Sequence, residues 1–198
     1  VLLIVCVGIF ISTLDGSILN IANPTLAREF SVSMQSIQWV VTAYMLVITA
    51  TLIFFGKLGD KIGNHKVYAY GFLIFTLGSF VCSVSPSLFY LVSSRIVQAF
   101  GASMLMANGM GIVSQAFPPN ERGKALGLTG SMVGIGNMAG PSIGGFLLAG
   151  FNWPIIFIIN IPIGLVGYYF AKRYLPQVVV ENNNIPFDFT GTFLFALF

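Results

Sequence analysis

Long apolar stretches, separated by short polar connections, make up nearly the whole chain. A helix needs about 20 apolar residues to cross the ~30 Å hydrocarbon core of a bilayer. Six stretches are close to that length, at residues 1–23, 37–56, 67–84, 88–114, 125–149 and 153–171. A seventh begins near Phe189 and stops with the sequence at Phe198. The pattern predicts an all-α polytopic membrane protein, and we expect the chain to be a piece of a longer one.

Composition excludes several other classes of protein. Hydrophobic residues make up 56% of the chain and charged residues only 8%, which is far fewer charges than a water-soluble domain carries. The net charge of +3 is too small, and too scattered over loops, to predict a nucleic-acid-binding face. The single histidine, His65, and the two cysteines, Cys6 and Cys82, lack the spacing of metal ligands. We therefore expect no nucleic acid, metal, cofactor or enzyme active site.

Lysine and arginine are concentrated on one side of the predicted spans. Seven of them follow the second, fourth and sixth spans: Lys57, Lys61, Lys66, Arg122, Lys124, Lys172 and Arg173. Only Arg28 lies in a connection on the other side. Because short basic loops are retained in the cytoplasm, the amino end is predicted to be cytoplasmic.

Two charged residues lie inside predicted spans, Asp15 in the first and Arg95 in the fourth. Counting 1.5 Å per residue from the outer span ends places both roughly 10–13 Å below the outer surface, so a direct or water-mediated pair is expected. A charge at mid-span costs on the order of 2.5–3.5 kcal/mol and usually marks an ion or substrate path. A carboxylate beside an arginine can exchange a proton for a cation if access alternates. The alternative is an ion pair that only holds two helices together.

The fifth predicted span is rich in small residues and contains a proline: Gly127, Gly136, Gly140, Pro141, Gly144 and Gly145. At about 100° per residue, one stripe runs through Gly127, Gly134 and Pro141, and a roughly opposite one through Gly136, Gly140 and Gly144. Such spacing lets membrane helices approach closely, and neighbouring groups satisfy the carbonyl that proline leaves free. We expect neighbours on both sides of this helix. Packing alone is the simpler explanation of these glycines.

The complete array from Gly127 to Gly145 resembles the fifth-helix signature of proton-coupled antiporters in the major facilitator superfamily. Residues 14–24 resemble the first-helix signature of its fourteen-helix drug:proton antiporter branch, with Ser17 where threonine is usual. Further residues fit the fourth-helix motif, although Ala99 replaces a usual glycine: Arg95, Gln98, Gly101 and Ala102. The resemblance implies that Asp15, Arg95 and Gln98 take part in proton coupling.

The connection after the second predicted span, residues 56–66, resembles the best-known loop signature of the same superfamily. The resemblance implies a conformational-switch loop formed by Gly56, Asp60, Lys61, Gly63 and Lys66. Glycine permits the tight reversal between the spans. Asn64 and His65 replace residues that are commonly basic. The alternative is a basic turn that only sets topology.

The resemblance also implies a domain organisation. Residues 1–171 would form an amino-terminal six-helix bundle of two inverted three-helix repeats. Residues 172–188 would be a cytoplasmic linker, and 189–198 the start of a seventh helix, whose sequence favours the fourteen-helix branch. The carboxy-terminal bundle of the same protein would then be a missing partner.

We predict a proton-coupled antiporter that exports lipophilic, often cationic, drugs across a bacterial cytoplasmic membrane. Its partners would be such a substrate, protons and the lipid bilayer, and some relatives also use a periplasmic adaptor. Two alternatives are a proton-coupled porter for one defined metabolite and a structural or sensor subunit that does not transport. Gln98, Tyr44 and Met104 are candidate cavity residues, with helix packing as the simpler role for each.

Overall fold

The computed structural model describes residues 1–176, and over this range the regular structure is helical throughout. The helices are α1 (Leu2–Glu29), α2 (Met34–Ile37), α3 (Trp39–Ile62), α4 (Asn64–Ser83), α5 (Leu88–Ala116), α6 (Pro119–Gly150), α7 (Ile155–Ile158) and α8 (Asn160–Tyr174). α2 continues into α3, and α7 into α8, so the described residues contain six units long and apolar enough to cross a membrane. The all-α, six-span prediction is confirmed.

Several helices are longer than the apolar stretches that predicted them. α1 continues through Pro24 to Glu29, so the proline does not end the helix. The predicted loop 56–66 is wrong in its extent, because residues 56–62 belong to α3 and α4 begins at Asn64, leaving Gly63 as the turn. Polar residues can extend a helix beyond the apolar core because they still make the backbone hydrogen bonds. The predicted linker begins inside α8, and its part beyond residue 176, with the predicted seventh helix, lies outside the described residues.

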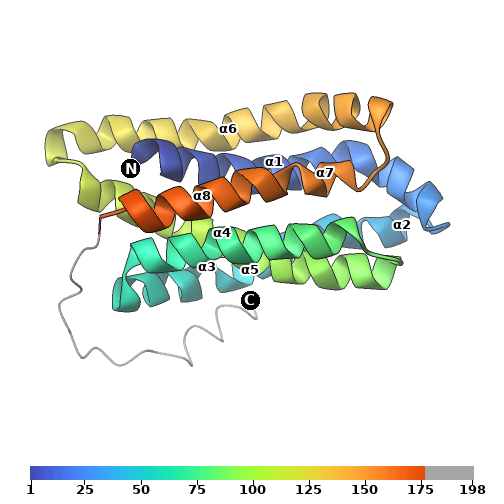
Figure 1. The fold of residues 1–198 in the computed structure, drawn as a ribbon, viewed down its shortest axis with the longest axis horizontal. Coiled ribbons are helices and arrows are strands. Elements are labelled where there is room, and N and C mark those ends of the chain that lie inside the picture. The colour runs from blue at the N-terminus through green and yellow to red at the C-terminus, as the bar shows by residue number, and fades with distance from the viewer. Residues whose placement is uncertain (177–198) are drawn as a thin grey trace.

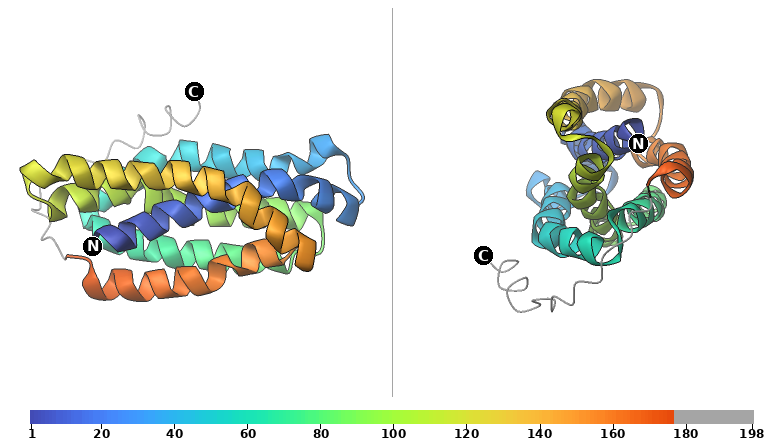
Figure 2. Two further views of the ribbon diagram at one scale, coloured as in Figure 1. Left: turned by 90° about the horizontal axis from the view of Figure 1, so that it is seen from above. Right: turned by 90° about the vertical axis from the view of Figure 1, so that its left-hand side faces the viewer.

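The helices lie side by side along the long axis of the molecule (Figure 1). α5 packs on both α3 and α4, α1 packs on α6 and α5, and α4 also packs on α8. Viewed end-on, α1 and α5 occupy the middle of the bundle and the other helices surround them (Figure 2). The first and fourth spans, which carry Asp15 and Arg95, are therefore the central ones.

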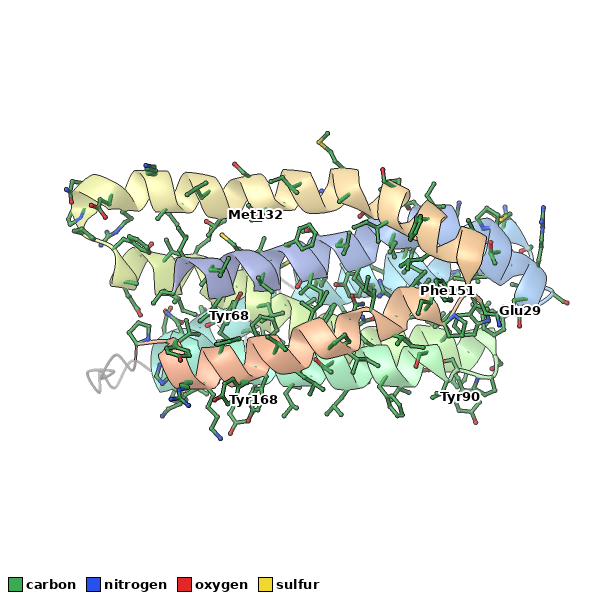
Figure 3. All side chains as sticks on the ribbon, turned by 45° about the horizontal axis from the view of Figure 1, so that its top comes forward. Glu29, Tyr68, Tyr90, Met132, Phe151 and Tyr168 are labelled. Atoms are coloured by element: carbon green, nitrogen blue, oxygen red, sulfur yellow. The ribbon has the colours of Figure 1, made fainter. Side chains whose placement is uncertain are left out.

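Two pairs of neighbouring helices are packed to different degrees. α4 and α5 approach closely because Gly78 faces the backbone of Gln98, and Gly101 faces the backbone of Phe75. α1 and α8 are packed much less closely on each other. Tyr68 of α4 spans the interior (Figure 3) and donates a hydrogen bond from its hydroxyl to the carbonyl oxygen of Val5, at 3.0 Å. The amino end of α1 is thus held to α4.

The basic connections gather at one end of the bundle. The turn between α3 and α4, the connection between α5 and α6, the end of α8 and residue 1 all lie at that end (Figures 1 and 2). The seven lysine and arginine residues that followed alternate spans in the sequence are therefore on one side. This is the charge asymmetry from which we inferred the orientation.

Candidate functional site

A buried ion pair lies at the centre of the bundle. Nη1 of Arg95, on α5, contacts Oδ2 of Asp15, on α1, in a direct salt bridge. Asp15 is 1% exposed and Arg95 is fully buried. The structure thus brings together the two charges that the depth estimate placed at the same level of the membrane.

Two amides complete the surroundings of the Asp15 carboxylate. Nε2 of Gln98 donates to Oδ1 of Asp15 at 2.9 Å. Nδ2 of Asn160, the first residue of α8, donates to the same oxygen at 2.6 Å. Both amides are buried. Asp15 therefore meets hydrogen-bond donors on both oxygens, which is the arrangement that makes a buried carboxylate tolerable.

Gln98 connects the carboxylate to the rest of the network. Its Oε1 accepts a hydrogen bond from Nη1 of Arg95 at 2.6 Å, and its Nε2 also donates to Oγ of Ser79 at 2.7 Å. Ser79 lies on α4 and is fully buried. Gln98 thus uses both ends of its amide and holds α1, α4 and α5 together.

The arginine is held in place by an aromatic ring and a backbone carbonyl. Its guanidinium carbon lies 3.8 Å from the centre of the Tyr44 ring, on α3, close enough for a cation–π interaction. Nε donates to the carbonyl oxygen of Val40 at 3.3 Å. The Tyr44 hydroxyl in turn donates to the carbonyl oxygen of Ser12, at 3.1 Å. One donor, Nη2 of Arg95, is buried without a partner among the described residues.

Sequence reasoning named three members of this network and missed others. Asp15, Arg95 and Gln98 meet as neighbours, whereas Asn160 and Ser79 were not assigned to the site. Tyr44 was named only as a candidate cavity residue, and its ring stacks on Arg95. Asn160 had a usable signal, because it is an amide within an apolar stretch and lies two residues before Pro162. Ser79 had none, since serine is common in membrane helices, where it often bonds its own backbone. Met104 is buried, and its backbone carbonyl accepts a hydrogen bond from Asn108, which lies outside the network.

The residues of the predicted switch loop lie far from this network. Asp60, Lys61 and Lys66 are exposed at the basic end of the bundle. Asp60 is twenty residues along α3 from Val40, which corresponds to about 30 Å of helix. Instead, the buried Asn64 side chain lies against the glycine backbones of α3 and α5, at Gly59 and Gly111. Asn64 thus occupies one of the places where a basic residue is usual.

Gly63 forms the turn and has a backbone φ of +104°, which residues other than glycine rarely adopt. We expect Gly63→Ala to lower the free energy of unfolding by about 1–3 kcal/mol through backbone strain. Gly56→Ala is the matched control, because a Cβ there would meet nothing within 4 Å. Thermal unfolding of the two purified variants measures the difference, and equal melting temperatures would contradict the strain.

The two glycine stripes of α6 differ in whether another helix packs against them. A Cβ on Gly136 would lie 2.1 Å from Oγ1 of Thr13, and one on Gly140 1.9 Å from Oγ of Ser17. The Ser17 hydroxyl donates to the carbonyl oxygen of Gly136 at 3.0 Å. Gly144 packs on Ile18. This stripe is therefore the contact surface with α1.

The second stripe has no close neighbour among residues 1–176. Space is open around Gly127, Gly134 and Gly145, and Pro141 is exposed. The expectation of close neighbours on both sides of α6 therefore does not hold within the described part of the chain. The physical reason is that α6 lies at the edge of the bundle, where only α1 packs closely along its length (Figure 2).

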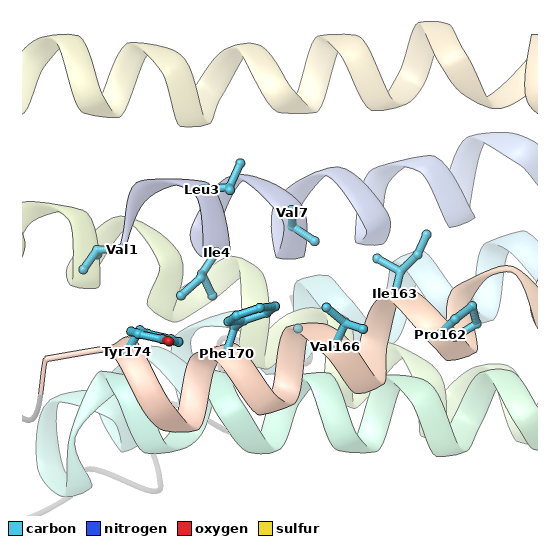
Figure 4. A pocket seen from close by; sticks show the side chains of 10 residues that line it. Val1, Leu3, Ile4, Val7, Pro162, Ile163, Val166, Phe170 and Tyr174 are labelled. Carbon is cyan, nitrogen blue, oxygen red and sulfur yellow. The ribbon is translucent and has the colours of Figure 1, made fainter.

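An apolar cavity of about 670 Å³ lies apart from the charged network, between the first half of α1 and α8 (Figure 4). Its walls include Leu3 and Val7 of α1 and Val166 and Phe170 of α8. It occurs where α1 and α8 meet, and these two helices are less closely packed on each other than α4 and α5 are. No charged residue lines it, so the ion pair does not open into this space.

Comparison with known proteins identifies the family. The family model described as "Major Facilitator Superfamily" matches residues 5–195, nearly the whole chain. The chain belongs to the major facilitator superfamily. Like other members of this superfamily of transporters, it is an integral membrane protein.

Among curated relatives, the chain is 62% identical over 196 residues to "Riboflavin transporter RibZ" of Clostridioides difficile, covering 99% of the chain and 43% of that protein. It is 33% identical to "Multidrug resistance protein Stp" of Mycobacterium tuberculosis (96% of the chain, 35% of that protein) and 31% identical to "Tetracenomycin C resistance and export protein" of Streptomyces glaucescens (98% and 36%). The chain spans less than half the length of these relatives.

Solved structures show the same fold. A peptide transporter, POT (E310Q mutant) in complex with sulfate, superimposes with a TM-score of 0.78 at 16% identity, over 90% of the chain and 40% of that structure. The proton:xylose symporter XylE superimposes with a TM-score of 0.76 at 12% identity, over 89% and 44%. At such identities the likeness concerns the fold alone. It agrees with six helices forming one half of a superfamily member.

Proposed function

We propose that the full-length protein is a proton-coupled secondary transporter for one metabolite, riboflavin, in a bacterial cytoplasmic membrane. The choice of riboflavin as the substrate rests on the 62% identity to a riboflavin transporter over 99% of the chain. Identity to the drug-resistance relatives is about half as high, at 31–33%. This difference favours our metabolite-porter alternative over drug export.

The proposed coupling group is Asp15. It is the acidic member of the buried network, and its ionised form is matched by Arg95. Binding a proton would cancel the carboxylate charge and weaken the attraction to Arg95, Gln98 and Asn160. A buried group whose loading changes helix–helix contacts can link proton binding to a change of access. Gln98 supports this role by holding both members of the pair.

The proposed orientation places the amino end and the basic end of the bundle in the cytoplasm, because basic loops are retained there. In the most hydrophobic segments of the spans that contain α3 and α6, only 22% and 17% of the residues are buried. The corresponding share is 61–67% for α1, α4 and α5. We propose that the second half of the protein covers part of these two helices and lipid the remainder. Rocking of the two halves would then alternate access.

Drug export remains a second candidate. The relatives named for multidrug resistance and for tetracenomycin C export match more than nine-tenths of this chain, and the glycine array of α6 resembles that of proton-coupled antiporters. In that case the fourteen-helix branch and a lipophilic substrate would apply. The third candidate is a structural or sensor subunit, for which no flux of any substrate is expected.

Transport by the full-length protein in liposomes separates these candidates. We expect uptake or release of radiolabelled riboflavin that depends on an imposed proton gradient and is competed by unlabelled riboflavin. A fluorescent lipophilic cation should be neither transported nor a competitor. Gradient-driven flux of the cation without riboflavin flux would instead establish drug export, and absence of both fluxes in correctly inserted protein would contradict transport by proton coupling.

A further inference from the structure

The Asp15 carboxylate must be accommodated in two protonation states if it carries a proton, and one neighbour is equipped for both. Each ionised oxygen needs hydrogen-bond donors, whereas a protonated carboxyl group needs an acceptor for its O–H. In a buried site an O–H without an acceptor costs about 1–3 kcal/mol. The side chains that contact Asp15 can therefore be examined for an acceptor that is free.

Arg95 and Gln98 cannot supply this acceptor. The guanidinium of Arg95 has only donors. The Oε1 atom of Gln98 already accepts from Nη1 of Arg95 at 2.6 Å, and the Sγ–H of Cys82 approaches it at 3.6 Å. Turning the Gln98 amide over would break these contacts and the bond to Ser79. Both groups are committed to the ionised form of Asp15.

Asn160 is different because only one end of its amide is used. Its Nδ2 donates to Oδ1 of Asp15 at 2.6 Å, while its Oδ1 is buried without a hydrogen-bond partner among the described residues. The side chain is itself 1% exposed, so bulk water does not satisfy that oxygen. A half turn of the terminal amide would exchange the two atoms and present the free oxygen to Asp15.

We propose that Asn160 is the positioning residue that adapts the site to proton loading, donating to ionised Asp15 and, after its amide turns over, accepting the proton of neutral Asp15. The proton enters on Oδ1 of Asp15, and the new O–H donates to Oδ1 of Asn160. The O–H is the one covalent bond formed, and the hydrogen bond from Nδ2 of Asn160 to Oδ1 of Asp15 is lost as the amide turns. This inference rests on the proposed proton coupling and adds a residue to it.

The position of Asn160 gives the exchange a structural consequence. Asn160 is the first residue of α8, directly after the interruption that ends α7 at Ile158. Pro162, in the first turn of α8, has no N–H to donate to the carbonyl of Ile158 across the interruption. The hydrogen bond from Asn160 joins the start of α8 to α1, and further along these two helices are separated by the apolar cavity. Proton loading of Asp15 thus changes a contact that holds α8.

The charged and titratable groups around Asp15 do not offer an alternative acceptor. They are Arg95 from α5, Tyr44 from α3 and Cys82 from α4. The Tyr44 hydroxyl is directed to the carbonyl oxygen of Ser12 and makes no hydrogen bond to Asp15 among the described residues. On the remaining neighbours, Glu121 is in the first turn of α6, and Lys172 and Arg173 are in the last turn of α8, about 18 Å along the helix from Asn160. The charge beside Asp15 is thus that of Arg95, which has only donors, so the acceptor for the proton is the free oxygen of Asn160.

Infrared difference spectroscopy of the purified full-length protein tests the inference without any substrate. A pH step that protonates Asp15 should produce a carboxylic-acid band that Asp15→Asn removes. The same step should change a side-chain amide band that shifts when asparagine is labelled with ¹³C and that Asn160→Leu removes. Because the labelled protein has its native sequence, this part of the test does not depend on a variant that folds.

Substitution of Asn160 tests in which direction this residue shifts the pH midpoint of the Asp15 band. Asn160→Asp keeps an acceptor and replaces the donor by a second carboxylate, so the pH midpoint of the Asp15 band should rise by about one unit or more through like-charge repulsion. Asn108→Leu is the matched control. Asn108 is also buried with an unpartnered Oδ1, but its Nδ2 bonds the backbone carbonyls of Phe55 and Met104. The Asn108→Leu variant should therefore leave the pH midpoint of the Asp15 band unchanged.

The outcomes distinguish the two levels of the proposal. No Asp15 carboxyl band at any pH at which the protein stays folded would overturn proton coupling itself. An Asp15 band with no accompanying asparagine band, or a midpoint that Asn160→Asp leaves in place, would overturn the role of Asn160 and leave proton coupling standing.

Discussion

Asp15→Asn is expected to reduce gradient-driven transport by the full-length protein to the background of empty liposomes. The substitution keeps the size of the side chain and removes both its charge and its ability to release a proton. If Asp15 carries the coupled proton, no residual pathway through this network remains, because Arg95, Gln98 and Asn160 do not exchange protons near neutral pH. Flux measured with and without an imposed pH gradient gives the result.

The same substitution should also destabilise the protein. It leaves Arg95 buried without its counter-charge, and breaking one side of a buried pair costs about 3–5 kcal/mol. Loss of transport could then reflect loss of folded protein, which a second variant separates. Asp15→Asn combined with Arg95→Met removes both charges and should recover most of the melting temperature while transport stays absent.

Glu29→Gln is the matched control for the loss of a carboxylate from α1, because Glu29 is exposed at the end of the same helix. It should transport normally. If the double variant regains gradient-driven flux together with stability, the pair only holds α1 and α5 together, which was the alternative weighed from the sequence.

Gly140→Val is expected to separate α1 from α6 and to lower the free energy of unfolding by about 1–3 kcal/mol, the usual cost of overpacking a close contact. A Cβ at this position would lie 1.9 Å from Oγ of Ser17 and 2.9 Å from the backbone nitrogen of Ile18. The serine could turn aside, but the backbone of α1 can only move away. That movement would also break the hydrogen bond from Ser17 to Gly136.

Gly123→Val, in the same helix, is the control for the general effect of replacing glycine, since a Cβ there would have open space around it. Melting temperatures of the two full-length variants in one detergent give the comparison. Equal values would mean that the close approach of α6 to α1 contributes nothing to stability.

The sequence was sufficient to predict the six spans and the meeting of Asp15 with Arg95. Apolar length decides whether a segment crosses a bilayer, and equal depth follows from the fixed rise of a helix. The depth of a residue in the membrane does not decide which way its side chain points, however. Asn160 lies at the start of α8 and reaches Asp15 only because α8 turns that face towards α1, and this rotation is set by packing against α4.

The glycines of α6 show the same limit. Their spacing correctly marked Gly136, Gly140 and Gly144 as a close-packing stripe, but it marked Gly127 and Gly134 equally. Spacing records which residues share a face, and it does not record whether a neighbour is present on that face. The turn at Gly63 was similar, since the glycine was recognised while the extent of helix on each side was not.

The side chains that the structure shows bonded to Asp15 all belong to the bundle within residues 1–176, and they are those of Arg95, Gln98 and Asn160. The charge of the carboxylate is therefore neutralised within this bundle. Domains of a growing chain fold in order from the amino end, so we expect this bundle to form in the membrane with no unpaired carboxylate while later residues are still being translated. The ion pair thus removes the need for a counter-charge from a later part of the chain during insertion.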